Sequence, residues 1–212
     1  NEFVLSKNNI NINEKGDYPE IIEPEMEKRL DLTSENSFMF KSWKNNNSPL
    51  LPLIHVNINK DKTSNLWIHA NSIAERISFN NKSIIEYFNE IYESIPLTTD
   101  WHNYLEKRLI SSAEFKIGKV NKAISICISL SKEKEIVDWS FHLTNVKCAA
   151  IIENKYLEAL NKRKSKLTTK ILQPYEMYEE QIKFITKIAT EFRNNQLKKG
   201  KYEIPREKNK IK

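Results

Sequence analysis

Basic residues are concentrated in the C-terminal part of this chain. Residues 154–212 hold 16 Lys and Arg against 7 Asp and Glu, a net charge of +9, whereas residues 1–153 hold 18 against 21, a net charge of −3. Clustered positive charges bind polyanions, because neutralising the phosphates releases their condensed counterions. The C-terminal segment therefore predicts an anionic partner, and a nucleic acid is the partner we expect first.

Several of these basic residues recur at helical spacing. At 100° per residue, positions 155, 162, 166 and 170 fall within an arc of about 80° on one side of a helix. Phosphates would contact this side and the basic residues around it, and the predicted nucleic-acid-binding residues are Lys155, Lys162, Arg163, Lys166, Lys170, Lys198, Lys199 and Lys201. The alternative is a solvated helix face that leads into a solubilising tail.

Four tyrosines lie among these lysines and could stack on bases. Tyr156 and Tyr178 fall on the apolar stripe of the predicted helices, so we expect them in the core, whereas Tyr175 and Tyr202 lie off it. The sequence shows no recognised base-reading helix, which predicts weak sequence specificity.

A second arrangement of residues could support cleavage of phosphodiesters. Asp100, Glu114 and Lys116 follow the order D-x13-E-x-K, in which two carboxylates bind Mg²⁺ and the lysine orients or activates water. Such sites place the acid and the E-x-K pair on adjacent strands, but Asp100 stands at the start of a predicted helix. E-x-K also arises by chance in a chain rich in Lys and Glu. A metal-dependent nuclease is therefore our third hypothesis.

A short aromatic patch interrupts a polar, acidic N-terminal segment. Residues 1–46 hold 9 acidic and 6 basic residues, and their aromatic side chains include Phe38, Phe40 and Trp43. Exposed aromatic side chains dominate the energetics of many interfaces, so these three residues are candidates for binding a protein partner. The alternative is that the patch docks the segment onto the core, because large aromatics are mostly buried.

Composition excludes several classes of protein. The chain has only 3 glycines, and glycine-rich phosphate loops need them in clusters, so nucleotide-binding folds of that kind are excluded. Cys127 and Cys148 form no C-x-x-C pair, which predicts two buried, reduced thiols, a usage compatible with the cytoplasm. The histidines have no metal-ligand spacing, so no metal or cofactor is expected. No apolar run reaches the length of about 18 residues that a transmembrane helix needs.

Two hairpins should position these side chains. Residues 50–58 and 66–73 are rich in apolar and β-branched residues around a polar connection. Residues 124–130 and 137–143 alternate apolar and polar side chains on either side of a charged turn, which predicts half-buried antiparallel strands with Trp139 in the core. A third strand is expected at 114–119.

Helices are expected on both sides of these strands. Apolar spacings of three and four predict helices over residues 81–95, 100–112 and 146–172, and a further helix begins at Pro174 and is capped by Gly200. The fold class is therefore α+β, with antiparallel β-hairpins, intervening helices and a C-terminal helical pair.

These observations predict three segments and one leading function. The segments are an acidic N-terminal arm (1–46), an α+β domain with C-terminal helices (47–200) and a basic tail (201–212). The leading hypothesis is a non-enzymatic nucleic-acid-binding domain, and the runner-up is a protein-interaction module of a larger assembly or secreted effector. Because the chain begins with Asn1 instead of Met, we expect a fragment of a larger protein.

Overall fold

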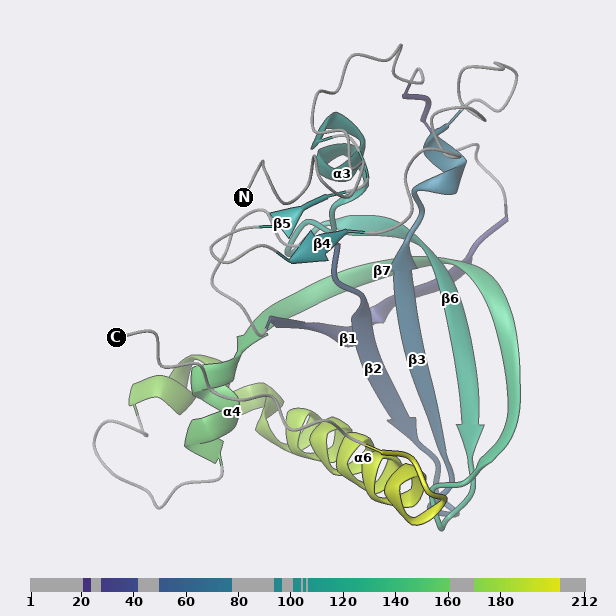
Figure 1. The fold of residues 1–212 in the computed structure, drawn as a ribbon, viewed down its shortest axis with the longest axis vertical. Helices are drawn as coiled ribbons and strands as arrows, with labels where there is room; N and C mark the ends of the chain where they lie inside the picture. The colour runs from purple at the N-terminus through teal and green to yellow at the C-terminus, as the bar shows by residue number, and fades with distance from the viewer. Residues whose placement is uncertain are drawn as a thin grey trace. The chain divides into compact units, whose positions relative to one another are not determined.

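A barrel of β-strands dominates the computed structural model of the chain, which describes residues 21–23, 28–41, 50–77, 94–96, 101–103, 105, 107–160 and 170–202. Within these residues five strands close into a barrel (Figure 1): β1 (Leu30–Lys41), β2 (Leu53–Ile58), β3 (Ser64–Asn71), β6 (Val120–Leu130) and β7 (Ile136–Glu153). Each strand is hydrogen-bonded to the next in chain order, and β7 returns to β1. The predicted α+β class is confirmed, but closure into a barrel was not predicted.

An odd number of strands determines how the barrel closes. β1 is antiparallel to β2 and parallel to β7. The short turns after β2 and β6 make the β2–β3 and β6–β7 pairs antiparallel, with closing hydrogen bonds from Asn59 N to Thr63 O and from Ser131 N to Glu135 O, both 2.9 Å. Strand direction therefore alternates from β1 to β7, and the fifth pairing of the ring has to be parallel.

The remaining described elements are short, apart from one helix. Between β3 and β6 lie η1 (Ala74–Arg76), β4 (Ile95–Pro96), β5 (Trp101–His102) and α3 (Lys107–Ala113), and after β7 come α4 (Asn154–Leu160), η2 (Gln173–Tyr178) and α6 (Glu179–Lys198). The chain divides into two compact units. The first comprises residues 1–54, 68–126 and 141–154, and the second comprises residues 55–67, 127–140 and 155–212.

The first unit contains two clusters of buried side chains. One cluster consists of Met39, Leu53, Phe115, Ala123, Val146 and Cys148, and a second consists of Ile77, Leu105 and Leu109. Barrel diameter grows with strand number, so a barrel of five strands has a narrow interior. Alanine, serine, cysteine and valine suit that space.

The narrow interior reverses the face that we expected to be buried in the β6–β7 hairpin. The hairpin itself is confirmed, but Ser125 and Cys127 are buried on β6, while the isoleucines at 124, 126 and 128 are half-buried. On β7, Trp139 is 58% exposed and Phe141 is 66% exposed. The prediction of Trp139 as a core residue was therefore wrong, because residues 136–141 are exposed on both faces of this part of β7.

Strand β7 also extends into the region where a helix was predicted. Val146, Cys148, Ala150 and Ile152 are buried at every second position, and the strand ends only at Glu153. Apolar residues in this segment also recur at spacings of three and four, which is typical of a helix. The pairing with β1 stabilises the strand instead. The prediction of a helix from residue 146 was therefore wrong, and α4 begins at Asn154.

Part of the predicted N-terminal arm is a barrel strand. Residues 30–41 form β1, in which Met39 lies opposite Leu53 of β2 and Ile151 of β7. Between Leu32 and Ser37 the register with β7 shifts, and the polar residues there interrupt the alternation that would have revealed the strand.

The region between the two hairpins differs from its prediction in three places. The predicted strand 66–73 ends at Asn71, and η1 follows it. The start of the predicted helix 100–112 is strand β5, and α3 begins only at Lys107. Instead of a strand at 114–119, the structure has an isolated parallel bridge between Ile117 and Cys148. Residues 81–93 of the predicted helix 81–95 lie outside the described residues, and the rest includes β4.

In the second unit the helix predicted after Pro174 is confirmed. Pro174 lies in η2, and α6 follows with Ile182, Ile185 and Ile188 buried along one side. The helix ends as predicted at Gly200, whose φ of +88° is a left-handed conformation suited to glycine. There Lys201 N donates to Gln196 O and Gly200 N donates to Leu197 O, both at 3.0 Å.

Candidate nucleic-acid interface

Charge is distributed unevenly along α6. Residues 179–191 hold 2 lysines and 3 glutamates, whereas residues 192–202 hold 4 Lys and Arg and no acidic residue. Glutamates in the first turn and lysines in the last turn both interact favourably with the helix macrodipole. The positive charge that the sequence assigned to this helix is therefore concentrated at its C-terminal end.

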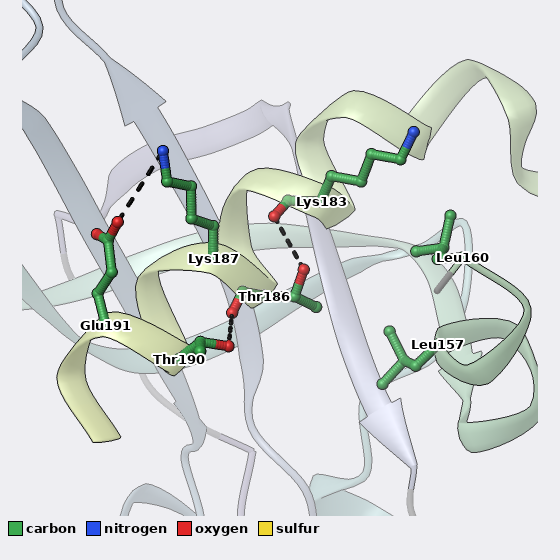
Figure 2. Close-up of a pocket in the computed structure, with 7 residues that line it drawn as sticks. All are labelled: Leu157, Leu160, Lys183, Thr186, Lys187, Thr190 and Glu191. Atoms are coloured by element: carbon green, nitrogen blue, oxygen red, sulfur yellow. Dashed lines mark hydrogen bonds and ion pairs between the residues drawn. The ribbon is translucent and has the colours of Figure 1, made fainter. Parts of the chain in front are cut away.

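The lysines in the first half of α6 are paired within the helix. Lys183 forms an ion pair with Glu179, and Lys187 Nζ lies 3.9 Å from a carboxylate oxygen of Glu191. Figure 2 shows the Lys187–Glu191 pair, and beside it Thr190 donates its hydroxyl to Thr186 O at 2.8 Å. Each of these charged groups has a local counter-ion, so this half of the helix attracts a polyanion only weakly.

Three of the predicted residues form an exposed group at the other end of α6. Lys198, Lys199 and Lys201 are all exposed, and among the described residues none of them has an ion-pair partner. Backbone hydrogen bonds around Gly200 hold the turn that carries them. We call these three lysines the basic end of α6.

The other predicted basic residues are not brought together on one described helix. Lys155 is exposed on α4, and Lys170 is exposed just before η2. Lys162, Arg163 and Lys166 lie outside the described residues. Because residues 146–153 belong to β7, the long helix on which we expected a single basic face is shorter than predicted.

A cavity of about 510 Å³ lies between α4 and α6 in the second unit (Figure 2). Leu157 and Leu160 of α4 form its apolar wall, and its polar wall consists of Lys183, Thr186, Lys187, Thr190 and Glu191 of α6. The threonine hydroxyls donate to carbonyls of their own helix, and the lysines are paired with glutamates. The polar wall is therefore satisfied by α6 itself.

The tyrosines near these helices separate into buried and exposed side chains. Tyr156 is 1% exposed and packs edge-on against Tyr175, with ring centroids 4.8 Å apart. Burial, with a smaller contribution from Glu179, raises the pKa of Tyr156 to about 12. Tyr202 is 82% exposed beside Lys201. Tyr156 is therefore a core residue as expected, and Tyr202 is the tyrosine available to a base.

The candidate protein-binding residues are not an exposed aromatic cluster. Phe38 is 0% exposed, Phe40 is half-buried, and Trp43 lies outside the described residues. A side chain without exposed surface cannot contact a partner, so Phe38 is a packing residue and not an interface anchor. Its burial agrees with the alternative in which the patch docks this segment onto the core.

The residues of the nuclease hypothesis are only partly described. Glu114 and Lys116 are exposed on the segment between α3 and β6, where Lys116 N donates to Asn121 Oδ1 at 2.7 Å. Asp100 lies outside the described residues. In the part of the chain that the structure describes, no three His, Cys, Asp or Glu side chains gather as metal ligands would.

The barrel interior contains a hydrogen-bonded group that the sequence did not suggest. Ser125 Oγ lies 2.7 Å from His69 Nδ1 and 2.6 Å from Thr144 Oγ1, and all three residues are 0% exposed. The group joins β3, β6 and β7. Nothing in the spacing of these residues along the chain identifies it, because they meet only when β3, β6 and β7 lie side by side in the sheet.

Two further polar side chains are buried in neutral form. His55 is 2% exposed and stacks on Trp67, with ring centroids 5.8 Å apart, and burial lowers its pKa to about 4. Burial raises the pKa of the Cys148 thiol to about 11. Cys127 and Cys148 are both buried free thiols, as predicted, and a raised pKa makes them poor nucleophiles.

Comparison with known protein families identifies the family of the chain. Residues 29–212 match the RNB domain, so the chain belongs to the RNB family. No curated protein matches the sequence. No helix among the described residues has the length and apolar character needed to cross a membrane.

Solved structures with a similar fold belong to longer chains. RNase R of Mycoplasma genitalium in complex with ribose-methylated single-stranded RNA has a TM-score of 0.62 at 15% identity, over 80% of this chain and 25% of that chain. The same enzyme in complex with double-stranded RNA has a TM-score of 0.62 at 16% identity, over 93% of this chain and 33% of that chain. Yeast Ssd1, described as a pseudonuclease, has a TM-score of 0.54 at 15% identity, over 71% of this chain and 19% of that chain. The chain thus spans about a quarter to a third of the RNase R chains.

Proposed function

We propose that this chain is the RNA-binding part of an RNB-family protein and that the basic end of α6 contacts RNA phosphates. Family membership supports the choice of RNA, because an RNase R of the same fold has been solved with single-stranded and with double-stranded RNA. The observation that carries the proposal is the composition of residues 192–202, which include Lys198, Lys199 and Lys201 and no acidic residue.

The chemistry of this end suits a flexible strand. Each phosphate neutralised on single-stranded nucleic acid contributes a slope of about −0.7 to the dependence of log K on log salt. Tyr202, exposed beside Lys201, offers a ring on which a base can stack, worth about 1–3 kcal/mol. Neither contact selects a base by hydrogen bonding, so the interaction should discriminate little between sequences.

The remaining predicted basic residues are proposed as a second set of phosphate contacts. Lys155 and Lys170 are exposed on the described chain, and Lys162, Arg163 and Lys166 come between them in sequence. Substituting all five with glutamine should lower RNA affinity further if they contact the same strand. An unchanged affinity would confine the interface to the end of α6.

We further propose that the chain binds RNA without cleaving it. A relative described as a pseudonuclease shares the fold, so the fold occurs without nuclease activity. A metal-dependent nuclease is the alternative, and the likeness to an active-site mutant of the Dss1 exoribonuclease from Candida glabrata favours it. Incubation of labelled RNA with Mg²⁺ or Mn²⁺ separates the two, and cleavage that is lost in Glu114→Ala would establish the nuclease.

The direct test of RNA binding is a salt titration. Fluorescence anisotropy of a labelled single-stranded RNA, measured from about 50 to 200 mM salt, should show binding whose log K falls linearly with log salt. A protein of similar size with an acidic net charge serves as the control for non-specific adsorption. Absence of binding at 50 mM salt would overturn the proposal.

A further inference from the structure

Lys134 makes an unusual set of contacts for a lysine in a turn. It lies in the β6–β7 turn and is only partly exposed, whereas Lys132 in the same turn is exposed. Its ammonium group donates to Lys62 O at 3.3 Å and to Ser64 Oγ at 3.2 Å. The same nitrogen lies 5.2 Å from the centre of the Phe184 ring, within the range of a cation–π contact.

These contacts join three elements of the second unit. Lys62 and Ser64 belong to the β2–β3 turn and the start of β3, Lys134 belongs to the β6–β7 turn, and Phe184 belongs to the first half of α6. All of them lie within the ranges 55–67, 127–140 and 155–212 that form this unit. One side chain therefore links both hairpin turns to the helix that carries the proposed RNA contacts.

The backbone of Lys134 is left-handed, as is that of Lys62 in the β2–β3 turn, where φ is +71°. Lys134 has a φ of +62°, a left-handed conformation that glycine or asparagine adopts with less strain. Turns of this kind commonly carry those residues instead. A lysine held at a strained position, with its ammonium group engaged three times, is explained by the contacts of its side chain.

We infer that Lys134 is a positioning residue, which fixes the direction of α6 and thereby of its basic end. This inference rests on the proposed function for its RNA readout. From Phe184 to Lys198 the helix rises about 21 Å, at 1.5 Å per residue. A change of about 10° in the direction of the helix at Phe184 would move its last turn by about 4 Å, which is enough to misplace lysines relative to successive phosphates.

The test compares two lysines of the same turn. Lys134→Met keeps the length of the side chain and removes the ammonium, and Lys132→Met removes the same charge from an exposed position. We expect Lys134→Met to lower RNA affinity about fivefold to tenfold and to make the salt slope smaller, because misplaced lysines at the basic end of α6 neutralise fewer phosphates. Lys132→Met should change affinity by about twofold or less. Lys134→Arg keeps the positive charge and should retain the affinity of the wild-type chain.

Hydrogen exchange tests the inference independently of RNA. The backbone amides from Ile182 to Ile188 should lose about tenfold in protection in Lys134→Met and keep it in Lys132→Met. Lys134→Gly sharpens the test, because relief of backbone strain alone would raise protection in the unit, whereas loss of the link should lower it in α6. Equal protection in the two methionine variants, or increased protection in Lys134→Gly, would overturn the inference.

The two readouts also distinguish the ways in which the account could fail. If the wild-type chain does not bind RNA, the proposed function is wrong, and a role for Lys134 in RNA binding is overturned with it. Hydrogen exchange then still decides whether Lys134 holds α6 in place. If the wild-type chain binds RNA and Lys134→Met loses α6 protection without losing affinity, α6 is held by Lys134 but its direction does not govern binding.

Discussion

Polar residues occupy two contrasting settings in this molecule, the barrel interior and the basic end of α6. In the barrel, His69, Ser125 and Thr144 are fully buried and hydrogen-bonded to one another. At the end of α6, lysines lie in solvent without ion-pair partners among the described residues. A buried polar group has to be satisfied inside the protein, whereas an exposed charge is hydrated and remains available to a ligand.

This difference separates stability from binding. Substitutions inside the barrel should change the free energy of unfolding and leave the RNA affinity of the folded protein unchanged. Substitutions at the basic end of α6 should do the reverse, because exposed charges contribute little to folding. The predictions below test each side of that separation.

The largest effect is expected from the fully buried aromatic side chain of Phe38. Phe38→Ala should lower the free energy of unfolding by about 3–5 kcal/mol, because it removes a fully buried ring and leaves a cavity. Urea denaturation followed by tryptophan fluorescence measures the change. If Phe38 instead anchored a protein partner, the substitution would leave stability unchanged, which would contradict its role as a packing residue.

Acid should weaken the fold through His55. Its pKa is lowered from 6.5 to about 4 in the folded chain, so the unfolded chain binds a proton in this window that the folded chain does not. The contribution of neutral His55 to the free energy of unfolding is therefore fully present above pH 6.5. It is lost as the pH falls toward 4, by up to about 3 kcal/mol.

Paired urea denaturations at pH 7.5 and pH 5 measure this loss. The variant His55→Phe keeps a ring against Trp67 and cannot titrate, so the difference in stability between the two pH values should be smaller than in the wild type. An equal pH dependence in both proteins would show that His55 is not the group responsible.

A smaller effect is expected from the hydrogen-bonded group in the barrel. Ser125→Ala removes the hydroxyl between His69 and Thr144 and should lower the free energy of unfolding by about 1–3 kcal/mol. Ser129→Ala, on the same strand but only half-buried, is the matched control and should change stability by about 0.5 kcal/mol or less. Equal stability of the two variants would contradict a structural role for the buried group.

Local pattern was sufficient to predict the hairpins but not their arrangement. The alternation around residues 124–143 identified two strands and their turn, because alternation depends only on neighbouring residues. The choice of inner face was not predictable from it, since a narrow barrel places Ser125 inside, and residues 136–141 of β7 are exposed on both faces. Strand β1 was missed because its register shift interrupts the pattern, and closure of the barrel depends on contacts between distant segments.

The candidate site was predictable where charge and helix signals coincide. Pro174, the spacing of the isoleucines and Gly200 located α6 and its end, and composition located the lysines there. The expected continuous basic face stays a prediction, because Lys162, Arg163 and Lys166 lie outside the described residues. Lys134 was overlooked, since its role depends on Phe184, 50 residues further along the chain.

The central claim is that the basic end of α6 contacts RNA, and one comparison of variants tests it most directly. Lys198, Lys199 and Lys201 are replaced together by glutamine, and Lys183 and Lys187 together by glutamine serve as the control from the paired half of the same helix. The account predicts that the triple variant keeps its stability, loses about tenfold in affinity for single-stranded RNA and has a salt slope smaller by about 2. The control should retain most of its affinity. An unchanged slope in the triple variant, or an equal loss per lysine in the control, would contradict the claim.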